Sequence, residues 1–336
     1  MLSDVKAVQP IKQRIYFLDV LKVLGTFLVI FAHLYSKDSI VRLYIYAFHM
    51  PLFYIISGIF HKSNGKINLK KHTQKIFVPA VFFCFFYLLL SFCLDCFRLN
   101  SISDATFSFF IGCYNTISGF IHGQSIPNTV CWFLFSLFYC KILADIYTSF
   151  PRKYKFLFLA LLTFLACLSF IPRYFFIKTA LMCFPFYILG YELRDVIKAL
   201  SFKWYLIPLV VICVIICYYL TNLNGKISVY SVYFGNLPTG LNHLCFYFNA
   251  LLGCTIFLAI SLFPFPQIDS ISHCSAALLT TVGIQRFFNL LFIQYIGIDQ
   301  NLLVSTIAAL IIMFLCYYMH IILKKYVPFA VGAKRY

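Results

Sequence analysis

The sequence predicts an all-α protein: a polytopic bundle of about ten transmembrane helices with both termini in the cytoplasm. Of its 336 residues, 62% are apolar and 11% are charged, whereas an ordinary soluble domain is about half apolar and a quarter charged. The apolar residues form stretches of about 20 residues, the length of a membrane-crossing helix. The basic residues gather in alternate loops. We therefore expect a single integral membrane domain over residues 1–336.

The expected spans are the uncharged stretches, taken in chain order. They are residues 16–36, 44–61, 76–94, 130–149, 156–172, 174–191, 204–221, 243–263, 274–295 and 301–323. Residues 105–121 are also uncharged, but Ser, Thr, Asn and two Gly accompany their Phe residues. We expect a re-entrant or interfacial segment there, because an eleventh full crossing would put the last three basic clusters outside.

The basic residues set the expected topology, because Lys and Arg in short loops stay on the cytoplasmic side. One side of a ten-span bundle receives eighteen of them: Lys6, Lys12, Arg14, Lys62, Lys66, Lys70, Lys71, Lys75, Arg152, Lys153, Lys155, Arg194, Lys198, Lys203, Lys324, Lys325, Lys334 and Arg335. The other side receives six: Lys37, Arg42, Arg98, Arg173, Lys178 and Lys226. This bias places both termini in the cytoplasm. It also explains most of the net charge of +17, so no nucleic-acid partner is expected.

The cysteines do not indicate a metal site. Fourteen Cys are scattered singly through apolar stretches, where Cys acts as a small hydrophobe. Cys93 and Cys96 form the only C-x-x-C. They could oxidise in a periplasm, although the pattern favours free thiols. The first span has a basic lead like that of a signal peptide but no small-residue cleavage site, so we expect it to be retained.

Ionisable groups inside spans are costly in hydrocarbon, so each is a candidate functional residue. The first span holds Asp19, Lys22 and His33. Lys22 and His33 are eleven residues apart, which places them on nearly the same helix face, about 16 Å apart along the axis. The i, i+3 spacing of Asp19 and Lys22 predicts an ion pair. His33 has no such partner, and is either a proton-exchanging residue or a buried core histidine.

A second histidine, His49, is expected at the same rim as His33. It stands in the sequence FHMP at 48–51, near the start of the second span. Proline is tolerated at a helix start, so a capped entry turn explains this stretch equally well. In the fourth span, the i, i+4 spacing of Lys141 and Asp145 predicts another ion pair.

Five stretches together resemble the membrane acyltransferase-3 family. They are RIYFLDVLKVLGTFLVIFAH (14–33), FHMPLFYIISGIF (48–60), KIFVPAVFF (75–83), CWFLFSLF (131–138) and FPFYILGYELR (184–194). The first contains a basic residue, Lys22, followed after ten residues by His33. The resemblance covers nearly the whole chain. It is closest to members that O-acetylate sugars of surface polysaccharides.

The resemblance implies a multi-pass enzyme of a bacterial inner membrane. It would move an acyl group, usually acetyl, from acyl-CoA in the cytoplasm to a hydroxyl of a cell-surface or exported glycan or a glycolipid. His33 would be the general base that deprotonates this hydroxyl. Lys22 would orient His33 or the donor's arm, with Asp19 as its partner. Three lysines of the basic loop would contact the CoA phosphates, unless they are ordinary positive-inside charge: Lys70, Lys71 and Lys75.

Four further residues would bind substrate. By resemblance, His49 would contact the acceptor or the tetrahedral oxyanion. Trp132 would stack on a sugar ring, or else anchor the chain at the membrane interface. Arg286 would bind an anionic part of the donor or its carbonyl oxygen, unless it forms a structural pair or snorkels. Similar proteins often have a histidine where this chain has Gln285, which can hydrogen-bond but cannot act as a base at neutral pH.

Two other classes of function remain open. In a transporter or flippase for a glycolipid or polysaccharide precursor, the intramembrane charges would form a path or proton relay. That function predicts repeats with matching helix breaks, and the sequence shows no clear repeat. In a catalytically inactive scaffold, the intact motif from Lys22 to His33 would have no purpose.

Overall fold

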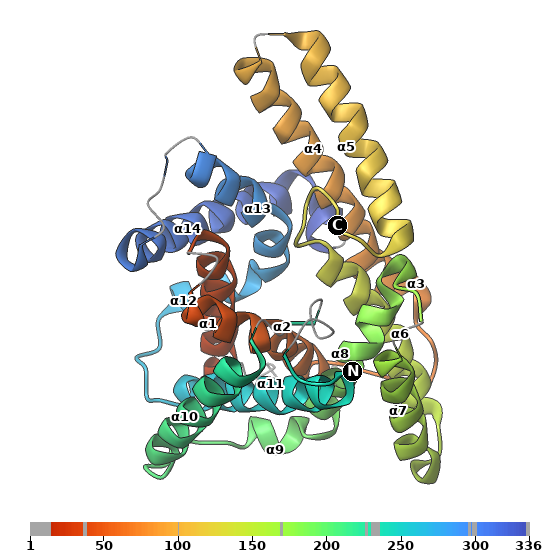
Figure 1. The fold of residues 1–336 in the computed structure, drawn as a ribbon, viewed down its shortest axis with the longest axis vertical. Helices are drawn as coiled ribbons and strands as arrows, with labels where there is room; N and C mark the ends of the chain where they lie inside the picture. The colour runs from red at the N-terminus through yellow and green to blue at the C-terminus, as the bar shows by residue number, and fades with distance from the viewer. Residues whose placement is uncertain are drawn as a thin grey trace, which may run out of the picture.

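The structure, a computed structural model, describes residues 15–35, 39–99, 101–168, 171–225, 228–229, 236–294, 297 and 301–333. Every regular element in these ranges is a helix (Figure 1). The α-helices are α1 (Tyr16–Leu34), α2 (Ile40–Ile59), α3 (Leu69–His72), α4 (Val78–Arg98), α5 (Ile102–His122), α6 (Trp132–Ser149), α7 (Arg152–Cys167), α8 (Ile177–Glu192), α9 (Arg194–Lys198), α10 (Leu206–Asn224), α11 (Thr239–Ser261), α12 (Asp269–Ala276), α13 (Leu278–Gln294) and α14 (Leu302–Tyr326). A π-helical turn, Thr73–Phe77, joins α3 to α4, and 3-10 turns lie at Tyr174–Phe176 and Pro328–Val331.

Each expected span coincides with at least part of a helix. Among the described residues, seven helices are long and apolar enough to cross a membrane, judged by length and composition. They are Tyr16–Leu34, Ile40–Ile59, Leu69–Arg98, Tyr174–Glu192, Leu206–Asn224, Gly240–Ser261 and Leu302–Tyr326. The pair α12 and α13 adds an eighth if it is one broken span. The chain is a multi-pass membrane protein; about ten crossings and two cytoplasmic termini stay predictions.

Two helix boundaries differ from the simplest interpretation of the sequence. The stretch 48–51 is not an entry turn, because α2 begins at Ile40 and Pro51 lies inside the helix. The side chain of Ser39 accepts from the Val41 amide and caps this earlier start. The expected span at 274–295 is not one helix either, since α12 and α13 meet at a bend of 76°.

Helix α12 packs against α1 beyond the bend, and no local sequence signal predicts this contact. The bend contains neither Gly nor Pro. It brings Ser272 and Ser275 of α12 against α1, where both hydroxyls donate to the Asp19 carboxylate. These two hydrogen bonds offset the free-energy cost of removing the Asp19 carboxylate from water.

The stretch expected to be re-entrant or interfacial is part of a complete helix. α5 has 21 residues and packs along α4, and the two form a hairpin that projects from the rest of the bundle (Figure 1). The Ser101 side chain caps its start by accepting from the Asp104 amide, and Gly123 ends it in the left-handed conformation. Cys93 and Cys96 of α4 are free thiols.

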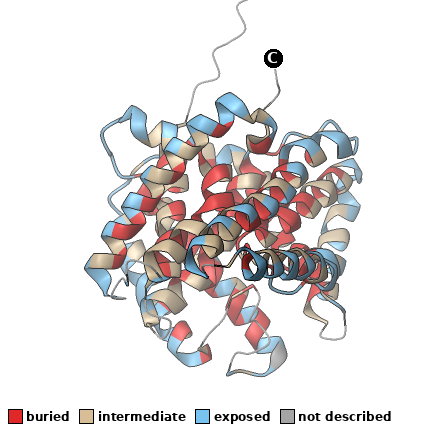
Figure 2. Cartoon of the chain, turned by 90° about the horizontal axis from the view of Figure 1, so that it is seen from above, coloured by how far each residue is buried: buried red, intermediate tan, exposed pale blue. Residues whose placement is uncertain are grey.

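Helix α2 lies at the centre of the packing, against α1, α8 and α11. Gly58 of α2 and Gly190 of α8 each face the backbone of the opposite helix, so these two helices approach very closely. Buried residues concentrate inside the molecule, and exposed residues lie around it (Figure 2). Many of the exposed residues are large and apolar, as a lipid-facing surface requires.

The segment 61–75 carries five lysines and defines one end of the bundle, which we call the basic end. Two recesses open there. The α1 recess, of about 930 Å³, is lined by Ile15, Asp19, Lys22, Ile59, Phe60, His61, Lys62, Ser63, Tyr191, Arg194, Lys198, Ser275 and Ala276. The lysine recess, of about 1060 Å³, is lined by Ile67, Asn68, Leu69, Lys70, Lys71, Gln74, Lys75, Val78, Phe329, Gly332 and Ala333.

Candidate active site

Four of the residues singled out in the sequence meet in one cavity of about 130 Å³. His33 comes from α1, His49 from α2, Trp132 from the start of α6 and Gln285 from α13. The rest of the lining is mostly apolar: Val29, Tyr46, Met50, Phe53, Val130, Phe133, Ser228, Val229 and Val282. A largely apolar cavity with a few convergent polar groups is the usual form of a small-molecule site.

His33 is held in place by Tyr46. Its Nδ1 lies 3.2 Å from the Tyr46 hydroxyl oxygen, to which Arg42 Nη2 donates at 3.3 Å. The Tyr46 ring lies between the two histidines, with ring centroids 5.8 Å from His33 and 5.1 Å from His49. This arrangement fixes Nδ1, and Nε2 has no hydrogen-bond partner among the described residues.

The hydrogen bonds of His49 define which of its nitrogens carries a proton. Nδ1 lies 2.7 Å from the Ile45 carbonyl oxygen. Because a carbonyl oxygen can only accept, Nδ1 donates, and a neutral ring then presents Nε2 as an acceptor. In that state His49 suits a hydroxyl group better than it suits an oxyanion.

Gln285 in the cavity and its neighbour Arg286 each carry a buried polar atom without a hydrogen-bond partner among the described residues. Gln285 is 1% exposed, and its Oε1 has no hydrogen-bond partner in the described part of the chain. Arg286 does not line the cavity, and its buried Nε likewise lacks a partner among the residues described. Such atoms are costly to bury unless a ligand or water satisfies them.

Lys22 and Asp19 lie away from this cavity, in the α1 recess. Lys22 Nζ is 3.3 Å from Asp19 Oδ1, which confirms the expected ion pair. The same nitrogen lies 4.5 Å from the centroid of the Phe60 ring, a cation–π contact. The motif therefore spans two places on α1: a paired charge at the basic end, and His33 in the cavity about 16 Å further along the helix.

The three lysines expected at the CoA phosphates also lie together. Lys70, Lys71 and Lys75 are exposed and line the lysine recess. A recess with three cations on one wall suits an anion, although exposed lysines at a basic end also fit the positive-inside pattern.

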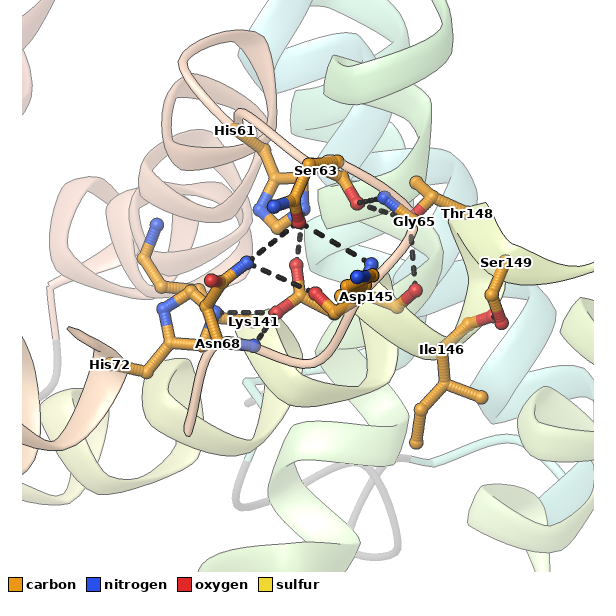
Figure 3. A network of polar contacts seen from close by, with 12 residues as sticks. His61, Ser63, Gly65, Asn68, His72, Lys141, Asp145, Ile146, Thr148 and Ser149 are labelled. Atoms are coloured by element: carbon orange, nitrogen blue, oxygen red, sulfur yellow. Dashed lines mark hydrogen bonds and ion pairs between the residues drawn. The ribbon is translucent and has the colours of Figure 1, made fainter. Parts of the chain in front are cut away.

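A buried polar cluster at the basic end was not predicted. Asp145 of α6 is fully buried, and its Oδ2 accepts from His72 Nε2 at 2.8 Å and from the Asn68 backbone amide at 2.9 Å (Figure 3). Its Oδ1 lies 3.2 Å from His61 Nε2. The sequence signal was the carboxylate itself, because a charge within an apolar span needs a partner.

The expected pair of Lys141 and Asp145 is wrong. Lys141 Nζ instead donates to the Tyr187 hydroxyl at 3.3 Å, and that hydroxyl lies 2.8 Å from His61 Nδ1. Burial, followed by the charge of Lys141, lowers the pKa of His61 to about 4, so its ring is neutral at neutral pH. Three groups of the segment 61–72 surround the carboxylate that local spacing had assigned to Lys141.

A cavity with two histidines inside a multi-pass bundle is the kind of site that a membrane-embedded enzyme uses for proton transfer. The family model described as an acyltransferase domain matches residues 15–324. The chain therefore belongs to the acyltransferase-3 family and is a membrane acyltransferase. No curated protein and no solved structure matches the chain.

Proposed function

We propose that this protein is an O-acyltransferase of the bacterial inner membrane. It takes an acyl group, most simply acetyl, from acyl-CoA and transfers it to a hydroxyl of a cell-surface or exported glycan or a glycolipid. The observation that carries the proposal is the meeting of His33, His49, Trp132 and Gln285 in one cavity. These four residues come from four different helices, and their spacing along the chain does not by itself bring them together.

His33 acts as the general base. When Nδ1 donates to the Tyr46 oxygen, Nε2 holds the lone pair that faces the substrate. Nε2 takes the proton of the acceptor hydroxyl, and the oxygen of that hydroxyl attacks the carbonyl carbon of the thioester. Collapse of the tetrahedral intermediate breaks the carbon–sulfur bond, and the protonated His33 returns the proton to the CoA thiolate. The products are the ester and free CoA, with no net change of proton or charge.

The other cavity residues bind and orient the reactants. Neutral His49 accepts a hydrogen bond from an acceptor hydroxyl through Nε2. Trp132 offers a ring face on which a sugar can stack. The unpartnered Oε1 of Gln285 accepts a hydrogen bond from a hydroxyl group of the substrate. Arg286, the neighbour of Gln285 in α13, does not line the cavity, but its positive charge stabilises the negative oxygen that forms on the carbonyl.

The CoA portion binds at the basic end. Two recesses beside the segment 61–75 carry positive charge that can bind its phosphates. They are the α1 recess, with Lys22 and Arg194, and the lysine recess. The α1 recess lies at the start of the helix whose later turns carry His33. Lys22 thereby binds or orients the donor, and Asp19 holds Lys22.

The test compares O-acyl groups on surface glycan from cells that carry the intact gene, no gene, or His33→Ala at matched membrane levels. Loss of a general base is expected to lower transfer by about 10²- to 10⁴-fold. His273→Ala is the matched control, because His273 is an exposed histidine of α12 outside the cavity. Full acylation by His33→Ala would overturn the assigned base. Failed glycan export with unchanged acylation per sugar would instead indicate the transporter.

A further inference from the structure

The buried cluster around Asp145 joins the two recesses of the basic end. His61 lines the α1 recess, and Asn68 lines the lysine recess. Both contact the same carboxylate: His61 Nε2 lies 3.2 Å from Oδ1, and the Asn68 amide is 2.9 Å from Oδ2. One side chain of α6 thus touches a residue of each recess.

The polar groups of the cluster adjoin one another from Lys141 to Asp145. Lys141 donates to the Tyr187 oxygen, and the same oxygen lies 2.8 Å from His61 Nδ1. His61 Nε2 lies 3.2 Å from Asp145 Oδ1 without forming a hydrogen bond. His72 Nε2 donates to Asp145 Oδ2 at 2.8 Å. The carboxylate is therefore fixed through Oδ2 and lies beside His61 at Oδ1.

The segment between the two contacts is also fixed to α6. Ser63 Oγ lies 2.6 Å from Thr148 Oγ1, which in turn donates to the Asp145 carbonyl. Within the segment, the Asn68 side chain donates to Asn64 Oδ1 and to the Lys66 carbonyl, both at 3.0 Å. The loop is therefore held at both ends and braced across its middle, while its lysines stay exposed.

Hydrogen bonds hold the cluster together. Among the described residues, no group of three or more His, Cys, Asp or Glu side chains has the arrangement of a metal site. Asp145 does not line the catalytic cavity either. Its contacts lead to the loop that separates the two basic recesses.

We propose that Asp145 is a positioning residue for the acyl donor. It fixes the segment 61–72 so that Lys62 faces the α1 recess while Lys70 and Lys71 face the lysine recess, where the phosphates of CoA bind. This inference rests on the proposed use of acyl-CoA. Asp145 does not touch the reacting atoms, so its loss weakens donor binding and leaves the chemistry at His33 unchanged.

The experiment measures CoA binding to the full-length protein in lipid nanodiscs by titration calorimetry. Asp145→Asn replaces one acceptor oxygen with an amino group that faces its donors, and the Kd for CoA is expected to rise about tenfold, equivalent to about 1.4 kcal/mol. His72→Leu should have a similar effect, whereas His72→Gln keeps an N–H of similar reach and should bind nearly as the wild type. Asp104→Asn is the control, an exposed carboxylate on the projecting hairpin.

The binding stoichiometry separates positioning from mere stability. A variant that only unfolds lowers the number of sites per protein and leaves the Kd of the remaining sites unchanged. An unchanged Kd in Asp145→Asn and His72→Leu, with wild-type protein that binds CoA, would overturn the positioning role alone. Wild-type protein that binds no CoA would instead overturn the acyl-CoA-dependent function and this inference with it.

Discussion

Helices α2 and α8 approach each other so closely that a methyl group does not fit between them at Gly58. A Cβ added there would lie 2.0 Å from the Tyr187 carbonyl oxygen, short of an ordinary 3.4 Å contact by about 1.4 Å. The obstacle is backbone, which cannot turn away as a side chain can. Gly190 has the reciprocal constraint, with an added Cβ 2.1 Å from the Ile55 carbonyl oxygen. Gly58→Ala must therefore push the two helices apart.

The cost follows from overpacking. Extra methylene groups in a well-packed interior usually cost about 1–3 kcal/mol, and an immovable neighbour favours the upper half of that range. We expect Gly58→Ala to destabilise the protein by about 2 kcal/mol. Gly240 provides the matched control, because it is also a helical glycine and an added Cβ there meets nothing within 4 Å. Gly240→Ala should be neutral or stabilise by up to about 1 kcal/mol.

Thermal unfolding in detergent, followed by tryptophan fluorescence or by loss of the monodisperse peak on size exclusion, measures both variants against the wild type. The predicted order of midpoints places Gly58→Ala lowest and Gly240→Ala at or above the wild type. If Gly58→Ala unfolds at the wild-type temperature, the close approach of α2 and α8 is not real. If both variants lose stability equally, the loss reflects glycine replacement in general and not this contact.

Two further predictions concern the cavity and the basic end. Gln285→Leu should raise the unfolding midpoint, because it removes a buried oxygen without a partner, while acyl transfer falls. Asn128→Leu also removes an unpartnered oxygen but breaks two bonds from Nδ2 to backbone carbonyls, so it should lower the midpoint. Equal shifts in both variants would refute the argument. The folded pKa of His61, about 4, lies below its usual 6.5, so its contribution to stability is complete above pH 6.5 and is lost as the pH falls toward 4. Midpoints measured between pH 7.5 and 4 should fall less steeply for His61→Gln, and an identical slope would contradict this origin.

The sequence predicted best those features that depend on a single helix. The period of the α-helix placed Lys22 and His33 on one face of α1, and the structure puts one in the α1 recess and the other in the cavity. The family resemblance added His49, Trp132 and Gln285, which the structure brings to the same cavity. Their convergence needs the packing of four helices, and no spacing along the chain encodes it.

The features that the sequence missed depend on contacts between distant segments. The bend between α12 and α13 lies in a stretch without Gly or Pro, and beside it two hydroxyls of α12 bond to Asp19, some 250 residues earlier in the chain. The sequence did not show that α5 is one continuous helix of 21 residues, capped by Ser101 and Gly123. It is not among the described helices that are apolar enough to cross a membrane, as its composition indicated. Composition alone cannot separate a polar helix from an irregular segment.

The two expected ion pairs show where local spacing is a sound guide. Asp19 and Lys22 form theirs at 3.3 Å, with the lysine side chain 18% exposed, so its charge keeps part of its hydration. Asp145 is fully buried, and donors from a separate segment surround it. Lys141, four residues away, finds the Tyr187 hydroxyl instead. A carboxylate deep in a bundle takes the partners that tertiary packing delivers, so spacing along one helix predicts its pairing only where no other segment folds onto it.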